Sequence, residues 1–284
     1  MLSDKRKKIA LVIGAGSVKC AAALGLWKVL EKEDIHFDMI VGCSGGSLYA
    51  AAMAMGFSLP DCIENTKKLW NRSITGQRNW LALASALLPG VLKFNNQFSM
   101  LSDGPMLKSF KSVFGEKTFA NTKTPLYVMA TDFETGESVA QHEGRLVDAL
   151  RASVAIPYIW SAWQHNGRLL IDGAASNPLP VDVPIREGVD IILAMGFQSP
   201  LPSRIKSVSR YAFYINSLMT NNLLNANFAF HNAVHHAEII SIFPEFERSI
   251  RLFDTDQIPY VIEQGEKAMQ QQLPYLKRLL ELES

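Results

Sequence analysis

The sequence is poor in features that define several protein classes. It has only 3 cysteines in 284 residues, Cys20, Cys43 and Cys62, which form neither a disulfide framework nor a CxxC metal pattern. Its 28 Lys and Arg residues balance 27 Asp and Glu residues, so no affinity for nucleic acid is expected. The apolar run near the N-terminus is too short for a signal peptide or a membrane span. These absences predict a cytoplasmic protein, long enough to bury a large core.

Strand-like and helix-like segments alternate through the first half of the chain. Short apolar runs predict strands, and Ala- and Leu-rich segments at helical spacing predict helices. "HNG" at 165–167 predicts a hairpin turn. The chain beyond about 200 is mainly helical. Strands are expected at 8–13, 37–42, 125–130, 168–171 and 190–196, with helices at 20–32, 46–55 and about 260–282.

This order predicts the α/β class, because strand–helix–strand units build parallel sheets. We expect one domain over residues 1–284, with a central, mostly parallel sheet flanked by helices. The sequence motifs occupy about 8–197, and the mainly helical part covers about 200–284.

The segment "GCSGG" at 42–46 places Ser44 between glycines where a strand turns into a helix. This G-x-S-x-G pattern is typical of a nucleophilic serine on a sharp turn, since flanking glycines let the backbone bend tightly. A purely structural turn explains the same residues equally well.

A second glycine loop, "GAGSVKC" at 14–20, follows the first predicted strand. It begins like a dinucleotide fingerprint, with Asp38 at a suitable distance, but Lys19 stands where the third glycine belongs. Neighbouring parallel strands would bring this loop beside Ser44, where its backbone N–H groups could hold an oxyanion.

A nucleophilic serine needs a base, and none of the 6 histidines is a convincing candidate. His165 belongs to the predicted hairpin turn, and His231, His235 and His236 lie on a helical segment. Asp172 follows a strand and should emerge on the same side of the sheet as Ser44. An aspartate in a turn is the alternative interpretation.

Taken together, "GAGSVKC", "GCSGGS" and "IDGAASNPLPV", supported by "ATDFETGESV" and "ALRASVAIPYIW", make the chain resemble the patatin-like phospholipase family over about 8–197. The resemblance implies a three-layer fold related to α/β-hydrolases, and acyl-ester hydrolysis by a Ser-Asp dyad without a cofactor or metal. It implies Ser44 as the nucleophile, Asp172 as the base and Lys19 as a head-group contact. The oxyanion hole would lie at Gly14, Gly16, Ser17 and Gly45.

The chain departs from the family pattern at Ser17 and Cys20, where many relatives have glycine. A catalytically weak lipid-binding or regulatory protein with the same fold is therefore the alternative function. The expected partner is a lipid or membrane-surface substrate. The apolar segment 79–94 is interpreted first as a buried helix, with a lid or a membrane contact as the alternative. "KRKK" at 5–8 is interpreted first as a solvated terminus, with attraction to anionic lipid as the alternative. The sequence predicts no oligomeric state.

Overall fold

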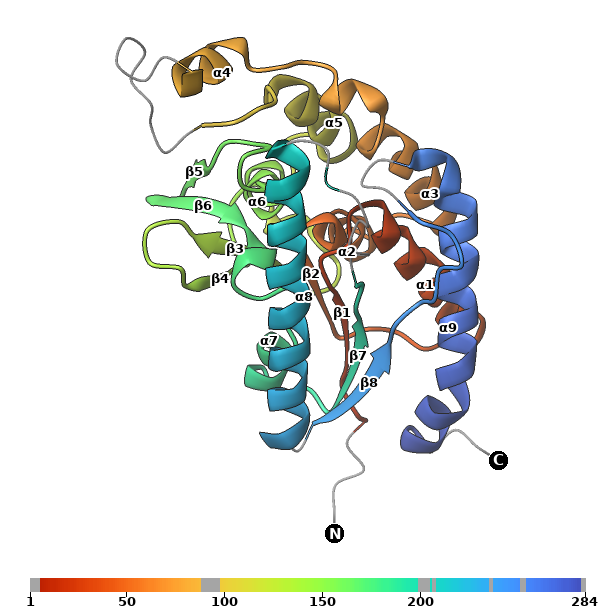
Figure 1. The fold of residues 1–284 in the computed structure, drawn as a ribbon. Helices are drawn as coiled ribbons and strands as arrows, with labels where there is room; N and C mark the ends of the chain where they lie inside the picture. Colours follow the sequence, from red (N-terminus) through yellow and green to blue (C-terminus); the bar gives the residue numbers. More distant parts are fainter. Residues whose placement is uncertain are drawn as a thin grey trace.

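The computed structural model describes residues 6–87, 98–198, 205, 208–234, 237–250 and 254–281. Within these residues the centre of the molecule is an eight-stranded mixed sheet of order β5-β6-β3-β2-β1-β7-β8, with β4 paired to β3 (Figure 1). Strands β3, β2, β1, β7 and β8 lie side by side in that order and are parallel. Strands β4 and β6 pair antiparallel with β3, and β5 pairs antiparallel with β6. The strands are β1 (Ile9–Ile13), β2 (Met39–Cys43), β3 (Leu126–Asp132), β4 (Ser138–Gln141), β5 (Trp163–His165), β6 (Arg168–Asp172), β7 (Ile191–Met195) and β8 (Glu238–Ile242).

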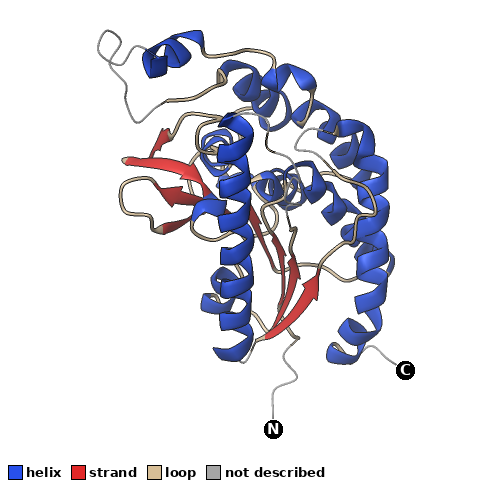
Figure 2. Ribbon diagram, viewed as in Figure 1, coloured by secondary structure: helices blue, strands red, loops and turns tan. Residues whose placement is uncertain are grey.

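Helices cover both faces of this sheet (Figure 2). The α-helices are α1 (Ala22–Lys32), α2 (Gly45–Ala54), α3 (Leu59–Leu69), α4 (Trp80–Leu87), α5 (Gly104–Phe114), α6 (Leu146–Ser153), α7 (Asp182–Arg186), α8 (Val208–Val234) and α9 (Ile258–Leu279). The 3-10 turns are η1 (Ser17–Ala21), η2 (Arg72–Thr75), η3 (Phe119–Asn121), η4 (Gly173–Ala175) and η5 (Thr255–Gln257).

The alternation of side chains along β1 separates two cores. Ile9, Leu11 and Ile13 pack with α1, α2 and α9 on one face. Ala10 and Val12 pack with α7 and α8 on the other. Successive residues of a strand point to opposite faces, so a strand buried on both sides is apolar throughout, as "IALVI" is. The predicted α/β fold with a mostly parallel sheet is therefore confirmed.

The last third of the chain docks through a close helix contact. A Cβ added to Gly25 on α1 would lie 1.9 Å from the carbonyl oxygen of Ile262 on α9, so the two helices approach at backbone distance. An ion pair of 2.8 Å between Lys28 and Glu266 borders this contact. Helix α9, from the C-terminal end of the chain, therefore packs directly against α1 (Figure 1).

The predicted elements of the N-terminal half agree with the structure to within a few residues. The 165–167 turn joins β5 to β6, with Asn166 and Gly167 both at positive φ, as a tight hairpin requires. Strand β8 was not predicted in the mainly helical C-terminal part, although its sequence "EIISI" is rich in β-branched residues.

Of the apolar segment 79–94, residues 80–87 form α4 and 88–94 lie outside the described residues. Among the described helices, none has the length and apolar character needed to cross a bilayer.

Candidate active site

Ser44 occupies the sharp turn between β2 and α2. Its backbone has φ 52° and ψ −130°, a conformation that side-chain-bearing residues rarely adopt and that costs about 1–3 kcal/mol. The turn is tight because α2 begins directly against the loop that follows β1. A Cβ on Gly45 would lie 2.8 Å from the Cα of Ser17, and one on Gly46 would lie 2.4 Å from the carbonyl oxygen of Ile13. Glycine at both positions is therefore a steric requirement of this turn.

The carboxylate of Asp172 lies directly beside this serine. The Oγ of Ser44 donates a hydrogen bond to Oδ2 of Asp172 over 2.7 Å, and both side chains are buried. The second oxygen, Oδ1, accepts the N–H of Ala174 over 2.9 Å. Asp172 ends β6, which pairs antiparallel with β3, so its side chain reaches the edge of the sheet where β2 also ends. Burial raises the pKa of Asp172 to about 7, against the opposing effect of the Ser44 and Ala174 hydrogen bonds.

The loop after β1 brings Gly16 and Ser17 beside the start of α2, as predicted. Ser17 has φ 57°, which explains why glycine is the easier residue at this position. Gly45 is the first residue of α2, where helix geometry leaves an N–H group without an intrahelical acceptor. Gly14 requires a correction, because its N–H donates to the carbonyl oxygen of Met195 over 2.9 Å. That amide belongs to the sheet, and the remaining oxyanion candidates are Gly16, Ser17 and Gly45.

An apolar cavity opens onto Ser44. Its volume is about 30 Å³, so it is a narrow cavity in this structure. Its walls come from α2, α3, η2, α5 and the loop that follows α6. The apolar side chains that line it include Leu48, Trp70, Ile74, Phe110, Ile156 and Trp160. An apolar lining of this kind suits a hydrocarbon chain rather than a polar ligand.

The sequence profile described as patatin-like phospholipase matches residues 11–185 of this chain. The chain belongs to the patatin-like phospholipase family. This confirms the resemblance noted in the sequence, and the matched region contains both Ser44 and Asp172.

Relatives of this patatin-like chain include an uncharacterized NTE family protein of Mycobacterium tuberculosis. It is 28% identical over 190 residues, which cover 66% of this chain and 48% of that protein. Mouse patatin-like phospholipase domain-containing protein 6 is 26% identical over 190 residues, covering 66% of this chain and 13% of that protein. The chain thus matches about half, or less, of the length of these relatives. Among solved structures, VipD from Legionella pneumophila has a similar fold, with a TM-score of 0.53 at 12% identity, over 95% of this chain and 67% of VipD.

Lys19 of this patatin-like fold lies inside the protein. Its side chain is 6% exposed, its Nζ donates to the carbonyl oxygen of Gln198 over 2.7 Å, and burial lowers its pKa. The contact therefore ties the glycine loop to the segment after β7. The predicted head-group contact stays a prediction, and this geometry favours a structural role.

Two cysteines near the site are buried. The thiol of Cys20 donates to the carbonyl oxygen of Gly14 over 3.4 Å, and Cys43 ends β2 beside Ser44. Burial raises the pKa of both thiols, which disfavours the reactive thiolate. Neither geometry points to a thiol nucleophile.

Among the described residues, the hydrogen-bond partners of Ser44 and Asp172 include no histidine. His165 pairs with Arg168 at the hairpin end of β6, opposite the end that carries Asp172. His231 lies near the end of α8 against Phe230, and His36 pairs with Asp34 before β2. His235 and His236 fall outside the described residues. The only described side-chain partner of the Ser44 hydroxyl is Asp172.

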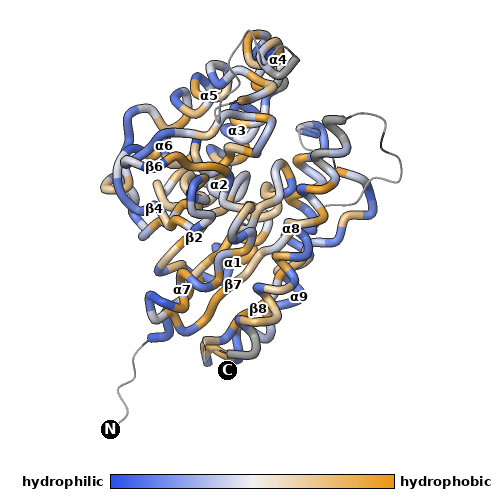
Figure 3. The backbone as a smooth tube through the Cα atoms, turned by 60° about the vertical axis from the view of Figure 1, so that its left-hand side comes forward, coloured by the Kyte–Doolittle hydropathy of each residue, from blue (hydrophilic) through white to orange (hydrophobic). Residues whose placement is uncertain are grey.

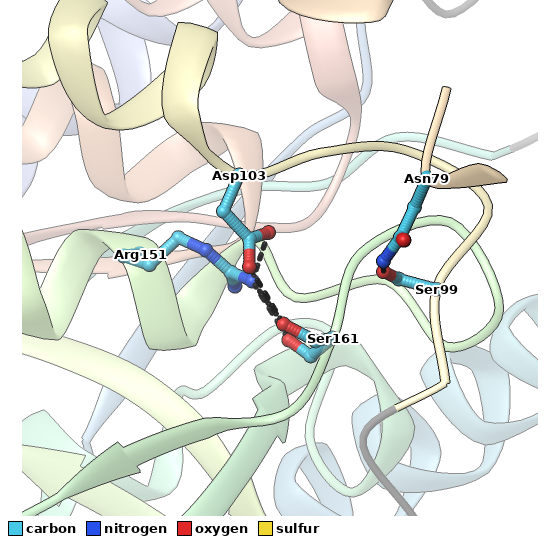
Figure 4. Close-up of polar contacts among 5 residues, drawn as sticks. All are labelled: Asn79, Ser99, Asp103, Arg151 and Ser161. Carbon is cyan, nitrogen blue, oxygen red and sulfur yellow. Dashed lines mark hydrogen bonds and ion pairs between the residues drawn. The ribbon is translucent and has the colours of Figure 1, made fainter. Parts of the chain in front are cut away.

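Three residues that hold the segments around the site were not predicted from the sequence, and all lie in "ALRASVAIPYIW". The Oγ of Ser153 accepts the backbone N–H of Ser44 over 3.0 Å. The carbonyl oxygen of Ala155 accepts the N–H of Asp172 over 3.0 Å. Arg151, whose side chain is 0% exposed, donates to Asp103 over 2.5 Å and to the carbonyl oxygen of Ser161 over 2.8 Å (Figure 4). The arginine and serine of "LRAS", set among apolar residues, were the available signal, because buried polar side chains need partners.

Proposed function

We propose that this protein is a serine acyl hydrolase that cleaves fatty-acyl esters of phospholipids or lysophospholipids. The observation that carries the proposal is the 2.7 Å contact between Ser44 Oγ and Asp172 Oδ2 at the mouth of an apolar cavity. Membership of the patatin-like phospholipase family supports a lipid ester as the substrate class.

In the first half-reaction Asp172 acts as the general base and Ser44 as the nucleophile. Oδ2 takes the proton from Oγ while Oγ attacks the acyl carbonyl carbon. We assign the N–H groups of Gly16, Ser17 and Gly45 to the oxyanion that forms. When the ester C–O bond breaks, the leaving alcohol takes the proton from Asp172 and an acyl-serine remains.

In the second half-reaction water replaces the alcohol. Asp172 takes a proton from water, and the hydroxide attacks the acyl-serine carbonyl. Breaking the bond to Ser44 Oγ releases the fatty acid, and the proton on Asp172 returns to the serine. The buried carboxyl, with its pKa raised to about 7, is a stronger base than an exposed aspartate, and this matches it to proton transfer near neutral pH.

The experiment is covalent labelling combined with turnover. A fluorophosphonate probe should label the wild-type protein, and Ser44→Ala should lose both the label and hydrolysis of a short-chain ester. Asp172→Asn keeps the shape of the side chain but lacks the base, so the rate should fall by at least about 10²-fold. His165→Ala is the matched control and should retain the rate.

Two outcomes would overturn this assignment. Undiminished hydrolysis by Ser44→Ala would exclude the nucleophile. Absence of labelling in a folded wild-type protein would favour the alternative, a lipid-binding protein with little turnover.

A further inference from the structure

Large apolar side chains stand in solvent at the start of α4. Trp80 is 70% exposed and Leu81 is 73% exposed, and the helix from Trp80 to Leu87 contains no charged residue. A Trp with this exposure leaves a large apolar area in water, which is uncommon unless the surface meets a partner. Figure 3 shows α4 at one end of the molecule, with much of its length in the hydrophobic colours.

The residues around this helix form a defined unit, here called the α4 arm and comprising residues 77–87 and 98–102. Its two stems pair with each other, since the N–H of Asn79 donates to Met100 over 3.0 Å and that of Ser102 donates to Gln77 over 2.9 Å. The side chain of Asn79 also donates to Ser99 Oγ over 3.0 Å (Figure 4). The base of the helix is thus held in place.

The α4 arm is joined to the wall of the catalytic cavity. Met100 donates its N–H to Tyr158 over 2.8 Å, and Leu101 donates to Ile159 over 3.0 Å. The segment that accepts these bonds also supplies Ile156 and Trp160 to the cavity. Directly after the arm, Asp103 is locked to buried Arg151 (Figure 4). A surface that binds Trp80 would therefore lie next to the wall of the cavity that Ser44 lines.

Tyr158 adds a third exposed apolar side chain beside this stem. It is 60% exposed and has φ 69°, a conformation that is a genuine outlier for a bulky residue. Strain of this kind persists where the surrounding structure imposes it, and it clusters at functional sites. The backbone of Met100 hydrogen-bonds both to Asn79, which precedes α4, and to Tyr158. Tyr158 is therefore linked to the start of α4 through one intervening residue.

The charge beside this helix is positive. In the α4 arm the one charged residue is Arg78, whose guanidinium lies 5.8 Å from the centre of the Trp80 ring. On α3, Lys67 is exposed and Lys68 pairs with Glu64 over 3.2 Å. Apolar side chains beside a cation match an anionic membrane surface, where each basic residue contributes about fivefold in binding.

We propose that the α4 arm binds the surface of an anionic phospholipid bilayer, with Trp80 and Leu81 entering the interface and Arg78 pairing with lipid phosphates. This inference rests on the proposed function, because a lipid-ester substrate is what brings the site to a membrane. It places the catalytic cavity over the bilayer, so an acyl chain could enter without crossing bulk water.

The test measures vesicle binding without turnover. The Ser44→Ala protein is sedimented with phosphatidylcholine vesicles, with or without phosphatidylglycerol. Binding should require phosphatidylglycerol and weaken as salt is raised. In the same background, Trp80→Ala/Leu81→Ala should weaken binding about tenfold or more, since two interfacial side chains are lost. Arg78→Gln should weaken it about fivefold.

The matched control is Met219→Ala/Phe230→Ala, which removes two exposed apolar side chains from α8 and should leave vesicle binding unchanged. Circular dichroism establishes that each variant is folded. Equal binding by the Trp80→Ala/Leu81→Ala and control proteins would overturn the proposal, as would binding that is indifferent to phosphatidylglycerol. A concentration-dependent dimer that only Trp80→Ala/Leu81→Ala abolishes, with no vesicle binding by the parent, would instead assign the arm to a second copy of the chain.

The two proposals fail separately. Vesicle binding by Ser44→Ala, together with an inactive and unlabelled wild-type protein, would refute the hydrolase and leave the membrane contact standing. Labelling and hydrolysis of a soluble ester without vesicle binding would refute the membrane contact and leave the hydrolase standing.

Discussion

The backbone N–H of Ser44 donates a hydrogen bond to the Oγ of Ser153 over 3.0 Å, although 109 positions separate the two residues in the chain. Ser153 is the last residue of α6, and the loop that follows it carries Ala155, whose carbonyl oxygen accepts the N–H of Asp172. One short segment therefore holds the backbones of both proposed catalytic residues.

Replacing Ser153 with Ala should lower kcat for a short-chain ester by about tenfold with little change in KM. The buried N–H of Ser44 would lose its acceptor, at a cost of about 1–3 kcal/mol, and the strained turn would relax. Ser47→Ala is the matched control, since the Ser44 carbonyl oxygen accepts both the hydroxyl of Ser47 over 2.6 Å and its N–H over 3.0 Å. Steady-state kinetics on both variants measures the difference. Equal losses in kcat would contradict a positioning role for Ser153.

The positive φ of Ser44 predicts that its two simplest replacements differ in stability. Ser44→Gly relieves the strain of the turn, whereas Ser44→Ala keeps it, so the glycine variant should be more stable by about 1–2 kcal/mol. Both variants should be inactive. Urea unfolding, monitored by circular dichroism, measures the free energy of unfolding. A less stable glycine variant would show that the turn is not strained.

The raised pKa of Asp172 predicts how activity depends on pH. The base works as a carboxylate, so the rate on an uncharged soluble ester should rise about tenfold per pH unit below 7 and level off above it. A pH–rate profile of kcat/KM measures this. A profile that is already flat at pH 5 would contradict a general base with this pKa.

Stability should have the opposite dependence. The folded-state pKa lies above the unfolded value, so between about pH 4 and pH 7 the folded protein binds more protons, and its stability falls as pH rises. Asp172→Asn has no charge to bury. It should therefore be more stable than the wild type at pH 8, by up to about 4 kcal/mol, and similar to it at pH 4. Thermal unfolding at the two pH values tests this, and equal differences at both would contradict it.

Lys19→Met should reduce turnover of a phospholipid and of an uncharged ester by similar factors, and should lower the free energy of unfolding by about 1–3 kcal/mol. The reason is that the hydrogen bond from Lys19 to the carbonyl oxygen of Gln198 is lost. Kinetics on both substrates and urea unfolding measure these effects. A head-group contact predicts the other outcome, a larger loss on the phospholipid.

Ile156→Trp should narrow the substrate range. Ile156 is half-buried and lines the cavity, so a larger side chain occupies space that a long acyl chain would need. Hydrolysis of long-chain esters should fall about tenfold or more relative to a short-chain ester, which serves as the internal control. A uniform change across chain lengths would show that the acyl chain lies elsewhere.

Local sequence patterns predicted several strands and helices of the first half of the chain and singled out Ser44, whereas the role of Asp172 as its base came from the resemblance to the patatin-like family. "GCSGG" specifies a tight strand-to-helix turn, because only glycine tolerates the backbone contacts at positions 45 and 46. "IALVI" specifies a strand buried on both faces. "HNG" specifies the hairpin that leads to Asp172. The strand and the hairpin follow from residues within a few positions, whereas the contacts that require glycine at 45 and 46 come from Ser17 and Ile13.

Only the tertiary structure determined which partners the residues of the site contact. Whether the N–H of Gly14 is available depends on β7 pairing with β1, and the position of Lys19 depends on Gln198, which lies 179 positions away. Ser153, Arg151 and Asp103 gained roles only because α6 packs beneath both the serine turn and the start of α5. Such contacts join segments far apart in sequence, and their hydrogen bonds form only when the sheet and its helices assemble. Local propensity therefore carries no record of them.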